Sequence, residues 1–208
     1  MSLSLASCGQ IPNGSIDPAL QPLVQSFLAD SQSSTATSSN SSLVPDTTDL
    51  SASFAPSLDA NVVGQCTLTQ YKGWINGKQE SWTEKNIQIS KLYWDNLSAL
   101  GQKVTMYHEL GHCTLSLIHD NNYVIFPDGL EGPESIMNAV ILPDDTNGVT
   151  TATNYWSTYI QQLFNAHQFV NSNIAAGAAQ DSQLTNPNRH NHAKYDRIEK
   201  GLVHIEND

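Results

Sequence analysis

The stretch VTMYHELGHCTLSLIHDN, residues 104–121, contains three histidines: His108, His112 and His119. In an α-helix, residues four apart lie on one face, one turn above the other, so the first two imidazoles can point at the same ion. Glu109 projects beside that ion without needing to bind it. Apolar neighbours such as Val104 and Leu115 predict that the helix is buried. Buried histidine and glutamate side chains need partners, and a metal ion is the simplest one.

The third histidine constrains where this helix ends. A helix unbroken from His112 to His119 would separate the two residues by about 10 Å along its axis, which is too far for one ion. The helix is therefore expected to end near Leu115–Ser116, and the chain must then turn back. No glycine lies between Gly111 and Gly129. Another residue must take the tight conformation, at a cost of about 1 kcal/mol or more.

Residues 108–112 form the pattern His-Glu-x-x-His, in which each conserved letter of the motif has a chemical role. Two histidines hold Zn²⁺ at nitrogen–zinc distances of about 2.0–2.1 Å. The metal lowers the pKa of a water molecule to about 7 and polarises the scissile carbonyl. Glu109 can take the proton of that water and later deliver it to the leaving amine. The motif predicts zinc-dependent hydrolysis of peptide bonds.

The wider sequence resembles the metzincin zinc peptidases, whose motif HExxHxxGxxH is followed by a tight turn that carries a methionine beneath the metal. ESIMN, residues 134–138, is similar to this Met-turn, with Met137 as its methionine. Together, GQC, a strand ending in YW, HELGHC, SIMN and YWSTYIQQLF resemble a group of bacterial lipoprotein peptidases, over about residues 60–166. The resemblance implies an α+β, zincin-like fold in which a small mixed β-sheet packs on the active-site helix and a C-terminal helix.

The resemblance also implies zinc on His108, His112 and His119, but the chain departs from the family pattern at the third ligand. The family's histidine position holds Ile118 here, and the histidine comes one residue later. A turn one residue longer, with His119 still a ligand, is the expected outcome. Asp120 is the alternative ligand, because aspartate takes this role in some related zincins. A glutamate at 131 or 134 would need a second helix, which FPDGLEGPES cannot form.

Charge and hydropathy exclude other classes of function. The 208-residue chain has nine Lys and Arg against twenty Asp and Glu, a net charge of −11. Nucleic-acid binders need clustered basic residues, so no nucleic-acid partner is expected. No apolar run of about 18 residues exists, so the sequence predicts no membrane-spanning helix.

The first residues indicate a membrane anchor of another kind. LASCG, residues 5–9, resembles a bacterial lipobox, in which the cysteine, here Cys8, is lipidated. The chain is then expected to begin inside the signal, and the protein to be lipid-anchored at the bacterial cell envelope. An ordinary buried cysteine is the alternative. Cys66 and Cys113 remain as a pair that forms either a disulfide, which such a compartment allows, or two buried free thiols.

Periodicity and turn signals divide the chain into four parts. Residues 1–16 form the truncated signal and lipobox region, and 17–58 an N-terminal helix, capped by Asp17, followed by a Ser/Thr-rich linker from residue 31. Residues 59–169 form the zinc peptidase domain, and 170–208 a polar tail. Within the domain we expect a hairpin at Asn76-Gly77, a strand over 86–94 at the edge of the cleft, loops over 120–150 and a final amphipathic helix.

The leading hypothesis is a zinc-dependent endopeptidase that acts on a protein or peptide and contacts the membrane only through its lipid anchor. A non-catalytic zinc-binding envelope lipoprotein is the alternative, and a structural envelope protein without metal is a third. The intact Glu109 favours the enzyme, because a purely structural zinc site has no use for a base there.

Overall fold

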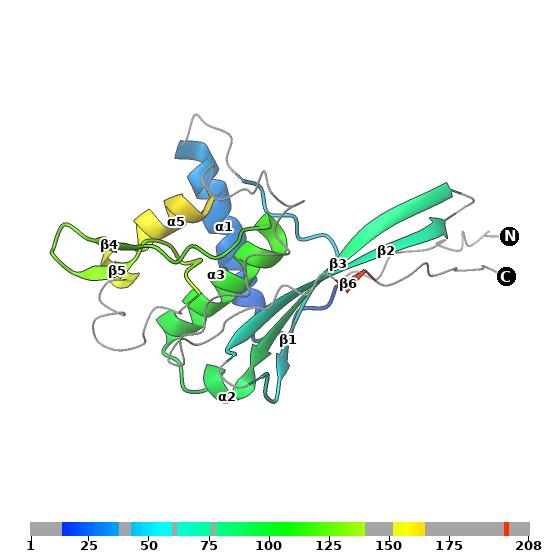
Figure 1. Ribbon diagram of the computed structural model, residues 1–208, viewed down its shortest axis with the longest axis horizontal. Coiled ribbons are helices and arrows are strands. Elements are labelled where there is room, and N and C mark those ends of the chain that lie inside the picture. The colour runs from blue at the N-terminus through cyan, green and yellow to red at the C-terminus, as the bar shows by residue number, and fades with distance from the viewer. Residues whose placement is uncertain are drawn as a thin grey trace, which may run out of the picture.

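The computed structural model describes residues 14–37, 43–59, 62–75, 78–139, 152–164 and 198–199. Its helices and strands are arranged as Figure 1 shows, and their bounds are α1 (Gln21–Thr37), β1 (Leu50–Ala55), β2 (Gly64–Ile75), β3 (Lys78–Ser90), α2 (Lys91–Trp94), α3 (Ala99–Leu115), β4 (Tyr123–Ile125), β5 (Glu131–Pro133), α5 (Trp156–Phe164) and β6 (Ile198–Glu199). The expected α+β class, with helices and a small sheet, is confirmed.

The larger sheet has the strand order β1-β3-β2-β6 and is mixed. β1 runs parallel to β3, β2 antiparallel to β3, and β6 parallel to β2. β4 and β5 form a separate antiparallel pair. β2 and β3 pair as far as Ile75 and Lys78, on either side of the predicted hairpin turn, whose own two residues lie outside the described part. Beyond the sheet this hairpin extends away from the body as a two-stranded arm (Figure 1).

Helix α3 is the centre of the molecule. The larger sheet lies on one side of it, and α1 and α5 lie on the other (Figure 1). The Ser98 side chain caps its start by accepting a hydrogen bond from the Gly101 N–H at 3.1 Å, as predicted. Every residue from Val104 to Leu115 is buried. A helix that is covered all round must place its polar groups in a site or against partners, because water does not reach them.

The helix α1 packs on α3 through aromatic side chains. The Phe27 ring lies 5.2 Å from the Tyr107 ring and 5.0 Å from that of Phe164 in α5, both edge to face. The Tyr107 hydroxyl donates to Asp30 Oδ2 at 2.6 Å. The N-terminal helix is therefore docked on the main body, and the core is continuous from α1 through β1 and the sheet to α5.

The prediction of a linker over residues 31–58 is wrong at both ends. α1 continues to Thr37, because Ser33 and Ser34 satisfy their hydroxyls on carbonyl groups four residues earlier and so remain compatible with a helix. Residues 50–55 form β1, which is stabilised by its six-residue parallel pairing with β3. Sequence composition could not show this pairing, since it joins segments 35 residues apart.

The strand expected over 86–94 also needs correction. β3 ends at Ser90, and Lys91–Trp94 forms the short helix α2. β3 lies between β1 and β2, so it is a central strand rather than the edge of a cleft. The loops expected over 120–150 contain the β4–β5 pair, and Ile198–Glu199 of the expected tail pair with β2. Among the described helices, none combines the length and the hydrophobicity that crossing a membrane requires.

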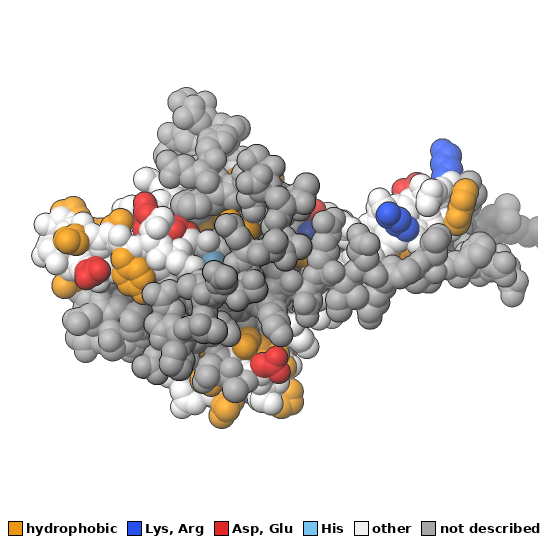
Figure 2. Space-filling model, in the orientation of Figure 1, with side chains coloured by type: hydrophobic (Ala, Val, Ile, Leu, Met, Phe, Trp, Pro, Cys, Tyr) orange, Lys and Arg blue, Asp and Glu red, His pale blue; other side chains and the backbone are white. Residues whose placement is uncertain are grey.

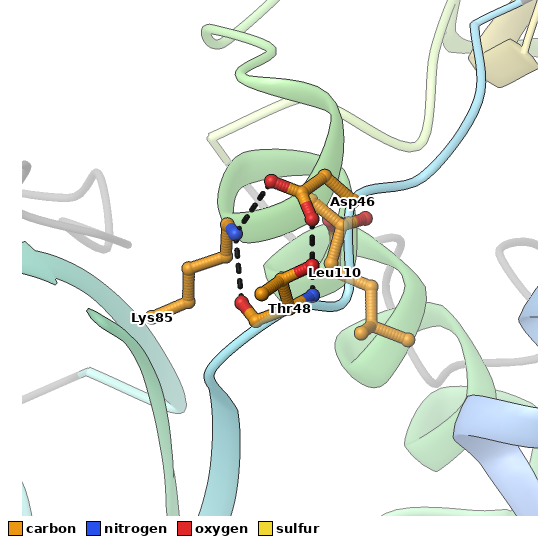
Figure 3. A network of polar contacts seen from close by, with 5 residues as sticks. Asp46, Thr48, Lys85 and Leu110 are labelled. Atoms are coloured by element: carbon orange, nitrogen blue, oxygen red, sulfur yellow. Dashed lines mark hydrogen bonds and ion pairs between the residues drawn. The ribbon is translucent and has the colours of Figure 1, made fainter. Parts of the chain in front are cut away.

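A crossing segment, residues 43–49, connects the three layers (Figure 3). Its Asp46 N–H donates to the Thr114 carbonyl of α3 at 3.0 Å, and the Leu43 N–H donates to the Phe164 carbonyl of α5 at 2.9 Å. The buried Lys85 ammonium of β3 donates to Asp46 Oδ2 and to the Thr48 carbonyl, both at 2.8 Å. The segment thus ties the sheet to the end of α3 that carries the histidines.

Replacing Asp46 by Asn should remove a pH-dependent part of this stability. The hydrogen bond from Lys85 lowers the pKa of Asp46 below its ordinary 3.8. A carboxyl with a lowered folded pKa stabilises the protein above its unfolded pKa, and this stabilisation is lost as the pH falls through the folded value. Because Asp46 is largely exposed, we expect a loss of about 1 kcal/mol or less at pH 7, which vanishes once the pH has fallen below the lowered pKa of Asp46.

Urea unfolding of both proteins across this pH range measures the difference. Asp95→Asn is the matched control, since it removes an exposed ion pair with Lys91. A deficit of Asp46→Asn that stays constant with pH would contradict the assignment.

Candidate metal centre

The three predicted histidines meet at one point. The Nε2 atom of His112 lies 2.9 Å from Nε2 of His108 and 3.1 Å from Nε2 of His119, and the third side of this triangle is 3.3 Å. His108 and His112 are buried, and His119 is half-buried. The three side chains are therefore close enough to bind one metal ion. Within the described ranges, no other group of three or more His, Cys, Asp or Glu side chains has ligand atoms this close, and Asp120 is outside the group.

The helix α3 ends just before Ser116, as the spacing of the three histidines predicted. The Ser116 backbone is in the left-handed region, with φ 56° and ψ 32°, immediately after the last residue of α3. The N–H groups of Ser116 and Leu117 both donate to the Gly111 carbonyl, which closes the end of the helix. The chain then reverses and brings His119 back over the face that carries the other two histidines. The prediction that a residue other than glycine takes the tight conformation is confirmed.

Backbone carbonyls fix which nitrogen of each helix histidine can bind a metal. His108 Nδ1 lies 2.8 Å from the Ile136 carbonyl oxygen, and His112 Nδ1 lies 2.7 Å from that of Leu117. A carbonyl oxygen only accepts, so each Nδ1 carries the hydrogen and each neutral ring has its lone pair on Nε2. The two Nε2 atoms that carry these lone pairs lie 2.9 Å apart. These carbonyls, which sequence reasoning did not identify, are the usual second layer of a metal site.

Burial keeps the helix histidines in the form that binds metals. Burial, and next the nearby His119, lower the pKa of His108 to about 3, although the Ile136 carbonyl opposes the shift. The pKa of His112 is lowered for the same first reason, with contributions from the two other histidines. Both rings are therefore neutral at pH 7, and a neutral imidazole is the ligating form.

Glu109 lies on the neighbouring face of α3, against the start of β2. Its side chain is 1% exposed, and its buried Oε2 atom has no hydrogen-bond partner among the residues that the structure describes. Burial raises the pKa of this carboxyl to about 8. A Cβ atom on Gly64 would lie 2.6 Å from Glu109 Oε1 and 2.8 Å from its Cγ. Gly64 thus lets the sheet close over the carboxylate. We did not single out this role from the sequence, because only the tertiary contact gives it.

Met137 lies in a tight turn against the same helix. The Met137 N–H donates to Ser135 Oγ at 3.1 Å, and the Asn138 N–H donates to the Ser135 carbonyl at 3.2 Å. A Cβ atom on Gly111 would lie 2.5 Å from the Met137 sulfur, so this glycine provides the space for the buried methionine. The turn also supplies the Ile136 carbonyl that orients His108.

Cys66 of β2 and Cys113 of α3 form a disulfide, so the alternative of two free thiols does not hold in this structure. Cys113 follows His112 directly. Cys66 lies two residues after Gly64, on the same face of β2. The bond thus anchors the strand that covers Glu109 to the helix that carries it. For the 47-residue separation, chain-entropy models give about 4 kcal/mol of stabilisation. Cys8 lies outside the described residues.

Comparison of the chain with protein-family models, with curated proteins and with solved structures found no match.

Metal binding should distinguish His119 from Asp120 as the third ligand. His119→Ala removes an Nε2 atom from the triangle, so we expect zinc affinity to fall by at least about tenfold. Asp120→Asn should keep the affinity within about a factor of three, because the amide retains the hydrogen bond from the Asn122 N–H to its Oδ1. Competition with a chromophoric chelator measures both. The reverse ranking would assign the third position to Asp120.

Proposed function

We propose that the protein is a zinc-dependent endopeptidase of the zincin type, with His108, His112 and His119 as metal ligands and Glu109 as general base. The convergence of three imidazole Nε2 atoms carries this proposal. The second supporting feature is the buried carboxylate of Glu109, directly after the first ligand, one oxygen of which has no hydrogen-bond partner in the described part of the chain. Such an orphan atom is costly unless a solvent or substrate group meets it.

The donor set favours zinc. Imidazole nitrogens suit zinc, copper, iron and nickel, and three histidines with an open position are characteristic of catalytic zinc. Tetrahedral zinc with nitrogen–zinc distances of about 2.0–2.1 Å requires its nitrogen ligands to be about 3.3 Å apart. The observed separation of 3.3 Å equals this value, and those of 2.9 and 3.1 Å are a few tenths of an ångström shorter, so binding a zinc ion needs only a small outward shift of the His112 ring. When bound, the metal supplies Lewis acidity toward a carbonyl oxygen and a water molecule.

The side chain of Glu109 provides the acid–base chemistry. Its free oxygen can accept a proton from the attacking water, and the protonated carboxyl can then donate to the leaving amine. Gly64 and the disulfide keep the carboxylate in a closed, dry position, where electrostatic interactions are stronger than in water. The His108 and His112 rings are held by backbone carbonyls and need no rearrangement before reaction.

The metzincin-like fold and the envelope location belong to the same proposal. A helix that ends abruptly after the second histidine, a third histidine after the turn and a methionine turn under the helix support the fold. A disulfide beside the active site supports an oxidising compartment. We therefore propose a lipid-anchored envelope protein, attached through Cys8, that cleaves proteins or peptides.

Glu109→Gln should abolish hydrolysis and leave the metal content unchanged. The amide has nearly the same shape but cannot accept the proton, so we expect kcat to fall by at least about 100-fold. A library of quenched fluorescent peptides, with zinc added, measures activity, and elemental analysis measures zinc. If the wild type holds stoichiometric zinc but cleaves no better than the variant, the non-catalytic zinc-binding lipoprotein replaces this proposal.

Gly64→Ala tests the same site without changing its chemistry. The added methyl group must push the Glu109 carboxylate aside, because the disulfide at Cys66 prevents the strand from moving away. We expect at least about tenfold lower kcat with unchanged zinc content. Gln65→Ala is the control, since the next residue along a strand points to the other face. Full activity of Gly64→Ala would show that Glu109 does not need this position.

A further inference from the structure

The β4–β5 hairpin has apolar side chains on both faces. Along β4, Val124 and then Phe126 just beyond its end point inward, and Phe126 is buried. Tyr123 and Ile125 point outward and remain 52% and 76% exposed. The alternation of a strand explains the two faces, but packing explains only the inner one. Large apolar side chains that are exposed side by side indicate an interaction surface.

The inner face holds the hairpin rigidly. The Phe126 ring stacks on the Tyr155 ring at 4.1 Å with 19° between the planes, and it meets Tyr159 of α5 edge to face at 6.0 Å. The Tyr159 hydroxyl donates to the Pro133 carbonyl of β5 at 2.8 Å. A surface that is already fixed loses little conformational entropy when it binds a partner.

The hairpin is continuous with the metal centre. The Glu134 N–H donates to the Asn122 carbonyl, and the Asp120 N–H donates to the Met137 carbonyl, both at 2.9 Å. These bonds extend the pairing of β4 and β5, at the end away from their turn, as far as Asp120 on one side and Met137 on the other, so that this end of the hairpin lies beside His119. Ile118, the residue before the third ligand, is also 42% exposed. A chain that lies on the outer face is therefore carried toward the three histidines.

The charge of this region has one sign. Glu131 is exposed and lies directly opposite Ile125, hence on the same outer face, and Asp128 is exposed in the turn. No Lys or Arg occurs between Lys103 and Arg189 in the sequence. In Figure 2, orange and red side chains gather over β4 and β5 without a blue one among them, whereas blue side chains mark the arm of β2 and β3. An apolar face within a negative field favours a cationic partner with apolar side chains.

We propose that the outer face of the β4–β5 hairpin, formed by Tyr123, Ile125 and Glu131, docks a cationic polypeptide segment with apolar side chains. This inference rests on the proposed peptidase function, and it names the substrate class: basic, amphipathic polypeptides. The aromatic and aliphatic side chains of the hairpin hold the apolar residues of the segment, and Glu131 attracts its lysine or arginine residues.

Binding of a labelled peptide to the Glu109→Gln protein tests the proposal without cleavage. The probe is a fluorescein-labelled peptide of alternating lysine and leucine, and its partner has glutamate in place of lysine. We expect the lysine peptide to bind at least about tenfold more tightly, and less so as salt rises from about 50 mM to about 500 mM. Tyr123→Ser combined with Ile125→Ser should weaken binding at least about tenfold. Glu131→Gln should weaken it and reduce the salt dependence.

Two variants elsewhere on the surface serve as matched controls. Leu92→Ser changes a side chain of α2 that is 61% exposed, and Glu80→Gln changes an exposed carboxylate of β3. Neither should change the affinity. Equal binding of the glutamate peptide to the unaltered hairpin, or equal losses in the control variants, would overturn the proposal. The first comparison needs no substitution in the hairpin and so does not depend on the folding of any hairpin variant.

Failure of the two proposals can be told apart. If the lysine peptide binds as expected but the wild type does not cleave it, the docking surface stands and the peptidase function falls. If the wild type cleaves lysine and glutamate peptides equally well, and the hairpin variants cleave both as fast, the peptidase function stands and the docking surface falls.

Discussion

The left-handed backbone of Ser116 is the constraint on which the candidate metal centre depends. This residue stops α3 directly after Leu115 and turns the chain, so that the Leu117 carbonyl reaches His112 Nδ1. The same turn allows His119 to return to the face of the helix. A serine in this conformation costs about 1–2 kcal/mol relative to its preferred backbone. The fully buried Leu117 side chain and the two hydrogen bonds to the Gly111 carbonyl offset that cost.

The second constraint is that α3 is covered on both sides. The sheet closes over one face at Gly64, and the Met137 side chain packs against another face at Gly111. A methyl group at either glycine would displace the side chain that it meets, Glu109 or Met137. Enclosure explains the electrostatics of the site. Neutral histidines and a carboxyl with a raised pKa are what burial produces, and a cation among the three nitrogens would stabilise the ionised carboxylate.

The chain between His119 and Met137 takes part in both the candidate metal site and the proposed docking face. Its inner residue Phe126 packs against Tyr155 and Tyr159, and the turn at its end places the Ile136 carbonyl on His108 Nδ1. Its outer residues are exposed beside the site. Under the two proposals, a change on the outer face alters binding of the polypeptide segment without altering the three histidines. The β2–β3 arm, which extends away from the body, lacks this connection (Figure 1).

The sequence by itself determined the elements whose causes are local. The spacing of His108 and His112 on a helix, the cap at Ser98, the paired strands around residues 76–77 and the end of the helix before His119 all follow from helix geometry and turn chemistry. The requirement for a residue other than glycine in a tight conformation followed as well, because an unbroken helix would separate His112 and His119 by about 10 Å along the axis, too far for one ion.

Tertiary structure alone decided the features that join distant segments. The parallel pairing of β1 with β3, the disulfide, the carbonyls on the two Nδ1 atoms and the approach of Gly64 to Glu109 depend on contacts that no local pattern encodes. Residues 50–55 largely alternate apolar and serine side chains, as a strand does, but the segment adjoins a Ser/Thr-rich stretch, and only its pairing with β3 identifies it as β1. The physical reason is that a side chain's local preference amounts to a few tenths of a kcal/mol, whereas pairing and burial across the fold amount to several.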